Sequence, residues 1–315
     1  MKAQPNAQQT QAAYQAKGAR VVPGSHPAQA RPIGVFDSGL GGLTVARALA
    51  HELPQESILY FGDTARCPYG VRDPHEVAEY VRQITAWIMQ YKVKMIVIAC
   101  NTASAVGLNA AQDQVDVPVF GVIEPGARAV MKKTKTNKVG VLATPTTVNM
   151  HAYTDAICAI NPQVEVYAAA SPRSVEIVEN TIVGPHAYGK DWMSDKAYFD
   201  TPFNHTVARE DLAPLIDKHV DAVVLGCTHF PLLKDVYADV LGPQVAIVSS
   251  AEHTAQEVST YLAEQNLLAS NNNTPTYHFA TTSDDVTGFC IAGEYIFGKK
   301  LRVAEHVSIA ELESL

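Results

Sequence analysis

The chain has 315 residues, a length that suits two domains of ordinary size better than one. Hydrophobic residues make up 47% and charged residues 18%, the balance of an ordinary globular protein. A net charge of −8, with no cluster of Lys and Arg, argues against a general nucleic-acid partner. No apolar stretch approaches the roughly 18–20 residues that span a bilayer, so no membrane association is expected.

The N-terminal segment is rich in Gln and Ala and lacks the roughly 7–15-residue apolar core of a secretory signal. We expect residues 1–32 to form a disordered N-terminal tail. The five cysteines are odd in number and widely spaced, unlike a disulfide framework. A cytoplasmic location is therefore expected, where thiols stay free for chemistry.

From residue 32 onward, short apolar runs alternate with longer amphipathic stretches, which predicts βαβ units and mostly parallel sheets. In the first half we expect strands at 32–36, 57–61, 95–99 and 117–123, and helices at 43–51 and 75–91. In the second half we expect strands at 138–143, 164–169, 221–226 and 244–249.

This weak internal repeat predicts an α/β fold made of two pseudo-symmetric domains. The first is expected to hold residues 33–124 and 250–315, and the second residues 125–249. A polar and aromatic stretch at 185–206, without clear periodicity, is interpreted as an insertion. Because ligands bind beyond the carboxyl ends of parallel strands, the active site is expected in the cleft between the domains.

SGLGGLT at 38–44 follows a strand and opens a helix, as a dinucleotide-binding loop would. Its third glycine position is Thr44, however, and Asp37 would repel a pyrophosphate. Asp37 instead suits an ammonium group, with the backbone N–H groups behind it open to a small anion. The alternative is that Asp37 and Ser38 only cap the helix. Local pattern leaves both interpretations open.

GDTARCPYG at 62–70 is a loop by its Gly and Pro residues. Pro68, Tyr69 and Gly70 have the backbone groups and the phenol to hold a ligand. Spacing alone favours an ordinary turn.

Two cysteines, Cys100 and Cys227, each follow a buried strand at the start of an expected helix. A helix N-terminus lowers a thiol pKa from about 8.5, which favours a thiolate near neutral pH. Asp37 and His229 are expected to hold or relay protons, one near each thiol. Uncharged donors for a carboxylate follow the two cysteines: Asn101, Thr102 and Thr228.

A metal centre is not expected, because only Cys-Thr-His is local and zinc takes three or four ligands. A thiol protease would leave one cysteine unexplained. No lysine at a strand end suggests a pyridoxal Schiff base, although Lys234 keeps that alternative open.

Two opposed thiols suit stereoinversion at a carbon acid: one face of the substrate loses a proton to a thiolate, and the other face receives a proton from a thiol.

At these motifs the chain resembles the glutamate racemase family. The matching stretches lie in order between residues 33 and 233: IGVFDSGLGGLTV, YFGDTARCPYG, ACNTASA, GVIEPG and LGCTHFPLL. The resemblance implies a cofactor-independent isomerase that supplies D-glutamate for peptidoglycan, with two domains closing on a small-molecule substrate, and a homodimer. It also implies that Cys100 and Cys227 are the acid/base thiols, assisted by Asp37, His229 and Glu179. The substrate-binding positions that it implies are Asp37, Ser38, Pro68, Tyr69, Gly70, Asn101, Thr102, Thr228 and His229.

The chain departs from the family at 171–180, which is more polar than usual, and at Ser249, where Asp is common. The first alternative function is the same chemistry on another carbon acid, aspartate or a hydantoin. The second is a regulatory protein that keeps the fold, since some family members inhibit DNA gyrase. Both thiols are present, which argues against a purely binding role and against a decarboxylase with one thiol.

Overall fold

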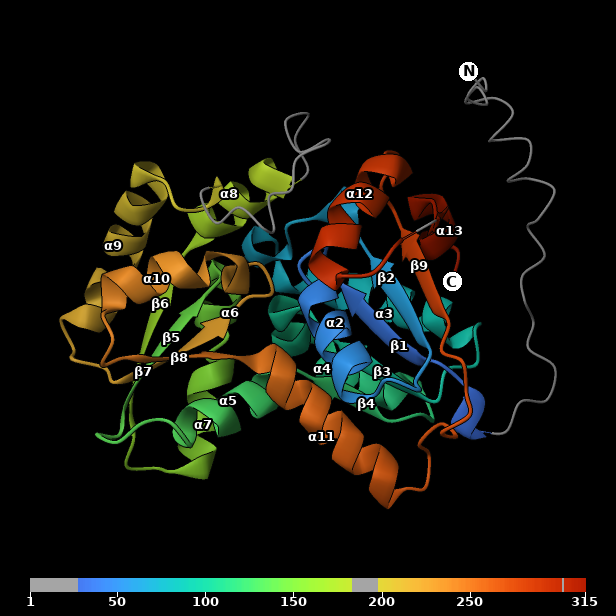
Figure 1. The fold of residues 1–315 in the computed structure, drawn as a ribbon, viewed down its shortest axis with the longest axis horizontal. Coiled ribbons are helices and arrows are strands. Elements are labelled where there is room, and N and C mark those ends of the chain that lie inside the picture. Colours follow the sequence, from blue (N-terminus) through green and yellow to red (C-terminus); the bar gives the residue numbers. More distant parts are fainter. Residues whose placement is uncertain (1–27, 183–197, 302) are drawn as a thin grey trace.

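The computed structural model describes residues 28–182, 198–301 and 303–315. Two parallel β-sheets lie side by side with helices on both faces of each, so the molecule has two lobes (Figure 1). The expected α/β fold with two mostly parallel sheets is confirmed. None of the described helices is long and apolar enough to cross a membrane.

The sheet of the first lobe has the strand order β10-β9-β2-β1-β3-β4, and every neighbouring pair is parallel. Its strands are β1 (Ile33–Asp37), β2 (Ile58–Gly62), β3 (Met95–Ile98), β4 (Val119–Gly121), β9 (Tyr277–Thr281) and β10 (Ala304–His306).

The sheet of the second lobe has the order β6-β5-β7-β8, again with parallel pairs only. Its strands are β5 (Lys138–Ala143), β6 (Glu165–Ala170), β7 (Ala222–Gly226) and β8 (Ala246–Ser249). The order repeats that of β2-β1-β3-β4, so β1 corresponds to β5 and β3 to β7. The internal repeat expected from the sequence is therefore present in the topology.

The central strands are apolar along their whole length because helices cover both of their faces. All five residues of β1 and all five of β7 are buried. Each large aliphatic side chain buried in this way contributes roughly 1.5–3 kcal/mol. The sheets are therefore rigid supports for the loops at their carboxyl ends.

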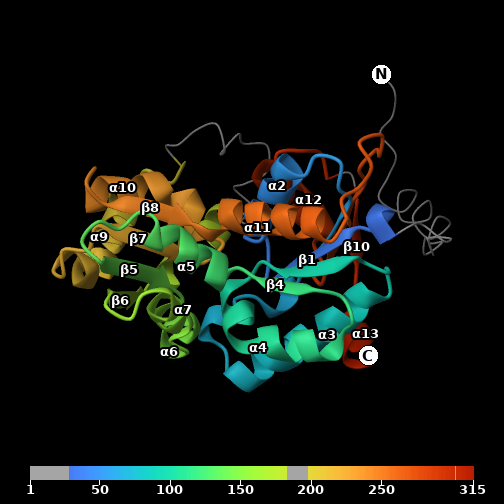
Figure 2. The same ribbon diagram turned by 90° about the horizontal axis from the view of Figure 1, so that it is seen from below.

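Helices cover the sheets in the order α2 (Leu43–Glu52), α3 (Pro74–Met89), α4 (Asn101–Gln114), α5 (Ile123–Met131), α6 (Pro145–Asn149), α7 (Ala152–Ile160), α8 (Pro172–Ile182), α9 (Pro202–Ile216), α10 (Lys234–Leu241), α11 (Ser250–Glu264), α12 (Val286–Phe297) and α13 (Ile309–Glu313). In the first lobe α2 packs against α11 and α12, and α3 packs against α4 (Figure 2).

The chain passes between the lobes twice. Helix α5 follows β4 and leads to β5, and α11 follows β8 and leads back to β9. The two helices pack against each other, and α11 also packs on α2. These two helices therefore carry the chain from one lobe to the other, and their packing holds the lobes together.

Two expectations at the segment ends are wrong. The strand expected at 117–123 is shorter, because Ile123 begins α5. The expected tail 1–32 is ordered at its end: Ala28–Ala30 is a 3-10 helix, and Lys94 Nζ donates 2.9 Å to the carbonyl of Gln29. The remainder, residues 1–27, lies outside the described residues.

The insertion expected at 185–206 lies outside the described residues up to 197. Its last part contains the start of α9, which begins at Pro202. Thr201 caps this helix by accepting the backbone N–H of Asn204 at 3.1 Å, and Pro202 is preset for the first turn.

Candidate active site

The first thiol follows a central strand of the first lobe. Strands β1 and β3 are neighbours, with Phe36 opposite Ile98, and the backbone N–H of Ala99 donates 2.8 Å to the carbonyl of Phe36. Asp37, which ends β1, and Cys100, two residues after β3, therefore lie at the same edge of the sheet.

The second lobe repeats this arrangement. Strands β5 and β7 are neighbours, with Ala143 opposite Gly226. Thr144 and Cys227 follow directly, so they share the carboxyl edge of the second sheet. Each sheet thus presents one thiol at its edge.

Both thiols line one cavity between the lobes. Its lining residues are Ser38, Pro68, Tyr69, Gly70, Cys100, Asn101, Thr102, Thr144, Val175, Cys227, Thr228 and His229. The cavity has a volume of about 20 Å³, which is room for about one water molecule. The lobes are therefore closed on each other in this structure.

Cys100 is the N-cap residue of α4, as the sequence predicts. Its Sγ accepts the backbone N–H of Ala103 at 3.4 Å and lies 3.8 Å from Ser38 Oγ. Burial, with the charge of Asp37 added, nevertheless raises the pKa of the Cys100 thiol to about 12. The expectation that the helix N-terminus lowers this pKa is wrong, because complete burial outweighs the single N–H bond.

Cys227 does not open an α-helix, and that expectation is also wrong. Thr228 and His229 come first, then the 3-10 helix Phe230–Leu233, and α10 begins only at Lys234. Cys227 instead has His229 beside it, with Nδ1 3.7 Å from Sγ.

His229 is hydrogen-bonded on both sides of its ring. Its Nε2 lies 2.5 Å from Glu179 Oε1, on α8, and its Nδ1 faces the thiol of Cys227. Burial lowers the pKa of His229, but the hydrogen bonds with Cys227 and Glu179 and their charges together raise it well above its ordinary value. Glu179, His229 and Cys227 thus form a relay along which a proton is held near the second thiol.

Asp37 is completely buried, and burial raises the pKa of its carboxyl. The carboxylate accepts the N–H of Gly39 at 3.0 Å and, across the lobes, the hydroxyl of Thr228 at 3.2 Å. Asp37 therefore orders the loop ahead of α2. The N-cap residue of that helix is Gly42, so the interpretation that Asp37 and Ser38 cap it is wrong. Asp37 also places a negative charge beside the cavity, as the ammonium interpretation requires.

The loop at 62–70 forms one wall of the cavity, and is more than the ordinary turn that its spacing alone favours. Tyr69 donates a hydrogen bond to Asp63, and Arg66 Nε lies 2.7 Å from the same carboxylate. Gly70 accepts the hydroxyl of Thr146 from the second lobe at 3.0 Å. The loop is thus fixed from both lobes.

Uncharged donors surround the first thiol. Tyr153 donates 2.8 Å to Asn101 Oδ1, and Thr102 Oγ1 lies 2.9 Å from Thr144 Oγ1. Within the described part of the chain, the buried Asn101 Nδ2 has no hydrogen-bond partner. Buried polar groups are normally paired, so this amide is an open donor for an oxygen in the cavity.

Ten of the residues expected at the site line the cavity, whereas Asp37 and Glu179 do not line it and are hydrogen-bonded to lining residues. Sequence reasoning missed Thr144, Val175 and Tyr153. Thr144 could have been found from the internal repeat, because it directly follows β5, and β5 corresponds to β1, which ends at Asp37. Val175 lies one helical turn before Glu179 on α8, a spacing that puts both on one face. Tyr153 carries no local signal.

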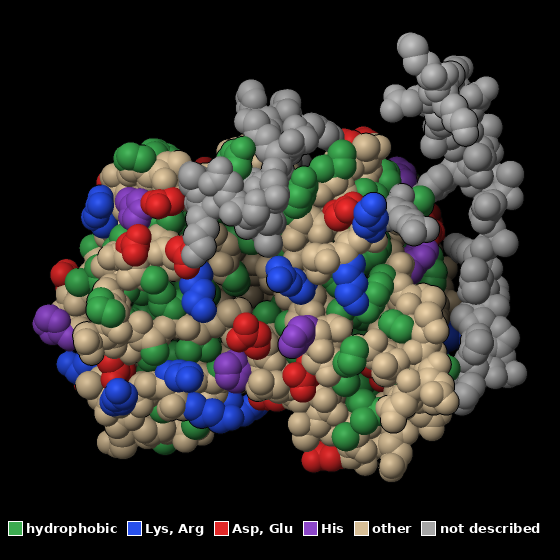
Figure 3. Space-filling view, in the orientation of Figure 1, with side chains coloured by type: hydrophobic (Ala, Val, Ile, Leu, Met, Phe, Trp, Pro, Cys, Tyr) green, Lys and Arg blue, Asp and Glu red, His purple; other side chains and the backbone are tan. Residues whose placement is uncertain are grey.

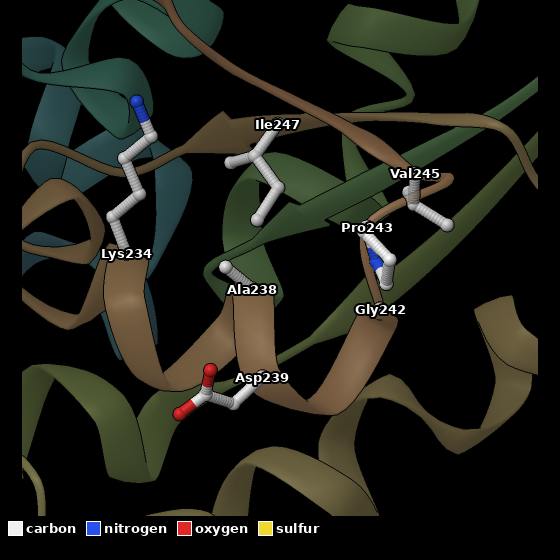
Figure 4. A pocket seen from close by; sticks show the side chains of 7 residues that line it. All are labelled: Lys234, Ala238, Asp239, Gly242, Pro243, Val245 and Ile247. Carbon is white, nitrogen blue, oxygen red and sulfur yellow. The ribbon is translucent and has the colours of Figure 1, made fainter.

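A larger open hollow of about 460 Å³ lies between α10 and β8 (Figure 4). Lys234 and Asp239 point away from each other there, and the remaining lining is Ala238, Gly242, Pro243, Val245 and Ile247. It brings no thiol, imidazole or paired carboxylate together, so we place the chemistry in the smaller cavity. Across the described ranges, no three His, Cys, Asp or Glu residues are grouped to hold a metal ion.

Two parallel α/β lobes each contribute one thiol to a shared, buried cavity. The chain belongs to the Asp/Glu/Hydantoin racemase family, whose model matches residues 43–258, and it is thereby an isomerase. It is 42% identical to a glutamate racemase of Syntrophus aciditrophicus over 88% of this chain and 97% of that protein.

Two solved structures are similar along nearly their whole length. Glutamate racemase isoform RacE1 of Bacillus anthracis is 38% identical, with a TM-score of 0.80 over 89% of this chain and 98% of that one. Glutamate racemase of Francisella tularensis, in complex with D-glutamate, is 33% identical, with a TM-score of 0.79 over 91% and 100%. The resemblance noted in the sequence is thus confirmed.

Proposed function

We propose that the protein interconverts L- and D-glutamate by proton transfer at Cα between two thiols, without a cofactor. The observation that carries this proposal is that Cys100 and Cys227, from the corresponding edges of two sheets, line one cavity. Relatives named glutamate racemase at 40–42% identity support glutamate as the substrate.

In the reaction the thiolate of one cysteine takes the Cα proton, and the electron pair of the broken C–H bond moves toward the substrate carboxylate. The thiol of the other cysteine then gives a proton to the opposite face, so one proton is lost and one gained. Protonated His229, held by Glu179, stabilises the Cys227 thiolate. The enantiomer bound decides which cysteine acts as the base.

Donors in the cavity support recognition of an amino acid. Asn101 Nδ2 is buried without a partner among the described residues, and an oxyanion on the substrate is the acceptor that it lacks. Asp37 supplies the negative charge for the ammonium group. We propose that the other substrate contacts come from the cavity lining: Ser38, Pro68, Tyr69, Gly70, Thr102, Thr228 and His229.

A cavity of about 20 Å³ is too small for glutamate, so substrate access requires the lobes to separate. We place the boundaries at 124/125 and 249/250, within α5 and at the start of α11, where the chain passes between the lobes. Contacts that cross the cleft, such as the bond between Thr228 and Asp37, then re-form around the substrate.

The resemblance also supports a biological role, which we include in the proposal. D-glutamate from this reaction supplies peptidoglycan synthesis in the cytoplasm, and the active form is a homodimer. Light scattering of the purified protein tests the dimer, and rescue of a D-glutamate auxotroph tests the role. On the face shown in Figure 3, Lys and Arg are interspersed with Asp and Glu, which does not favour a nucleic-acid partner.

The decisive experiment follows each glutamate enantiomer in D₂O by optical rotation and by deuterium at Cα. We expect racemisation with deuterium incorporation for the wild type, and loss of racemisation in both Cys100→Ala and Cys227→Ala. Cys290→Ala, a half-buried cysteine on α12, is the matched control and is expected to keep full activity. A wild type that neither racemises glutamate nor exchanges its α-proton rules out the proposal, and normal racemisation by either single variant rules out the two-thiol assignment.

Aspartate and hydantoins are the competing substrates, since the family name covers them. The same assay with each compound, compared by kcat/KM, separates them from glutamate. A higher value for aspartate would transfer the two-thiol mechanism to that substrate.

A further inference from the structure

A third thiol lies beside the relay of the second lobe. Cys67 follows the 3-10 helix Thr64–Arg66 and precedes Pro68, which lines the cavity. Its Sγ lies 3.9 Å from Glu179 Oε1. No role for this thiol follows from the two-thiol reaction.

The contact is fixed by packing as well as by the hydrogen bond. A Cβ atom built on Gly39 would lie 3.2 Å from Cys67 Sγ and 3.5 Å from Glu179 Oε1. The thiol, the carboxylate and the glycine backbone therefore meet at one point, and a larger residue at position 39 would separate them.

Cys67 is a donor rather than an acceptor in this contact. Burial raises the pKa of its thiol well above the ordinary value, and the charges of Glu179, Asp37 and Cys100 raise it further. At neutral pH the group is an S–H, and a carboxylate is its natural acceptor.

The accepting oxygen is the one that also holds His229. Glu179 Oε1 lies 2.5 Å from His229 Nε2 and 3.9 Å from Cys67 Sγ. Glu179 is on α8 of the second lobe with its side chain 22% exposed, whereas Cys67 belongs to the first lobe. The thiol thus restrains a partly exposed carboxylate from across the cleft, and only while the lobes are closed.

We propose that Cys67 is a positioning residue for the reaction: its S–H orients Glu179 so that His229 stays aimed at Cys227 in the closed form. This inference rests on the proposed function, because it takes the orientation of His229 to serve proton transfer at Cys227. It implies that the relay of Glu179, His229 and Cys227 is complete only when the lobes are closed.

The kinetic test compares Cys67→Ala, which removes the donor, with Cys67→Ser, which keeps one. We expect kcat/KM for glutamate to fall about threefold to tenfold in Cys67→Ala, the scale of one lost hydrogen bond. Cys67→Ser is expected to stay within about twofold of the wild type by the same reasoning, and Cys290→Ala is the control for loss of a thiol elsewhere.

Isotope effects with α-deuterated L- and D-glutamate separate positioning from folding. If proton transfer at Cys227 becomes slower, the substrate isotope effect rises for the enantiomer that Cys227 deprotonates and falls for the other. The fraction of folded protein does not alter this ratio. Unchanged isotope effects, with Cys67→Ala and Cys67→Ser equally impaired or both normal, would overturn the inference.

A second measurement does not depend on activity. The ¹⁵N signals of the His229 ring, assigned with His229→Gln, are expected to shift in Cys67→Ala and to stay near wild-type values in Cys67→Ser. A wild type inactive on glutamate would remove the proposed function while leaving this measurement valid. Identical His229 signals in Cys67→Ala and the wild type would overturn the positioning role by themselves.

Discussion

The hydroxyl of Tyr153 donates a hydrogen bond of 2.8 Å to Asn101 Oδ1, joining α7 of the second lobe to α4 of the first. Both side chains are buried, at 2% exposure each. The bond leaves Asn101 Nδ2 as the open donor beside Cys100. Orientation of this amide therefore depends on a residue of the other lobe.

Removal of that hydroxyl should cost both stability and activity. In Tyr153→Phe the buried Asn101 Oδ1 loses its partner, which costs about 1–3 kcal/mol in the free energy of unfolding. We expect kcat/KM for glutamate to fall with it, because the amide is free to turn. Urea denaturation and racemisation assays measure the two effects. Tyr261→Phe on α11 is the control, and equal behaviour of the two variants would contradict a role for the Tyr153 hydroxyl.

The charge of Glu179 supports protonation of His229. Glu179→Gln removes that charge while keeping the size of the side chain, so the pKa of His229 should fall. We expect kcat/KM to fall roughly tenfold to a hundredfold, less than the roughly 10²–10⁴-fold of a group that itself transfers the proton, because Glu179 acts through His229. An NMR titration of His229 and a pH–rate profile measure the shift.

Glu176→Gln is the matched control for that variant, since Glu176 is exposed on the same helix. It should leave both the titration and the rate unchanged. A His229 pKa that stays the same in Glu179→Gln would show that the relay is not electrostatic.

The buried carboxylate of Asp37 is expected to lower the stability of the folded protein. Its folded-state pKa is raised above the ordinary 3.8, so the ionised carboxyl opposes folding at neutral pH by about 1.4 kcal/mol for each pKa unit. As the pH falls below the unfolded-state pKa of 3.8, the carboxyl becomes protonated in both states, and this penalty disappears. Asp37→Asn should therefore be more stable than the wild type at pH 7 but not at pH 3.5.

The same variant should lose racemisation, because no negative charge remains for the substrate ammonium. Thermal unfolding at the two pH values, with activity at pH 7, measures both effects. Destabilisation at pH 7 would show that the hydrogen bonds to Gly39 and Thr228 outweigh the cost of burying the charge.

Close approach of the lobes depends on Gly41. A Cβ atom at this position would lie 2.5 Å from Thr228 Oγ1 and 2.8 Å from His229 Nδ1. Gly41→Ala must therefore push the lobes apart, and a displacement on the order of 1 Å at a reacting group costs about a hundredfold in rate. We expect that loss in kcat/KM with near-normal far-UV circular dichroism. Wild-type kinetics in this variant would show that the closed arrangement is not the reactive one.

Local reasoning located the site well where the chain itself supplies the cause. The strands that lead to Cys100 and Cys227 were predicted because buried parallel strands are apolar runs, and Cys100 does cap α4. The strand expected at 117–123 ended too late, because an apolar run does not mark where Ile123 turns into a helix.

The pKa of Cys100 is a property that the sequence did not predict correctly. A helix N-terminus is visible in the sequence, but complete burial of the Cys100 thiol is not, and burial decides the direction of its pKa. The loop at 62–70 is a turn by its spacing. Its place on the cavity wall comes from Thr146 of the other lobe.

The sequence by itself determined the two sheets and the one thiol at the edge of each, because apolar runs and strand-end residues are properties of short segments. Only the tertiary structure decided which groups surround each thiol. Glu179 is 50 residues from His229, and Tyr153 is 52 from Asn101. Such partners meet only when the chain is folded and the lobes pack together. The burial and the charges that result, rather than the segment that carries the cysteine, decide the protonation state of the thiol.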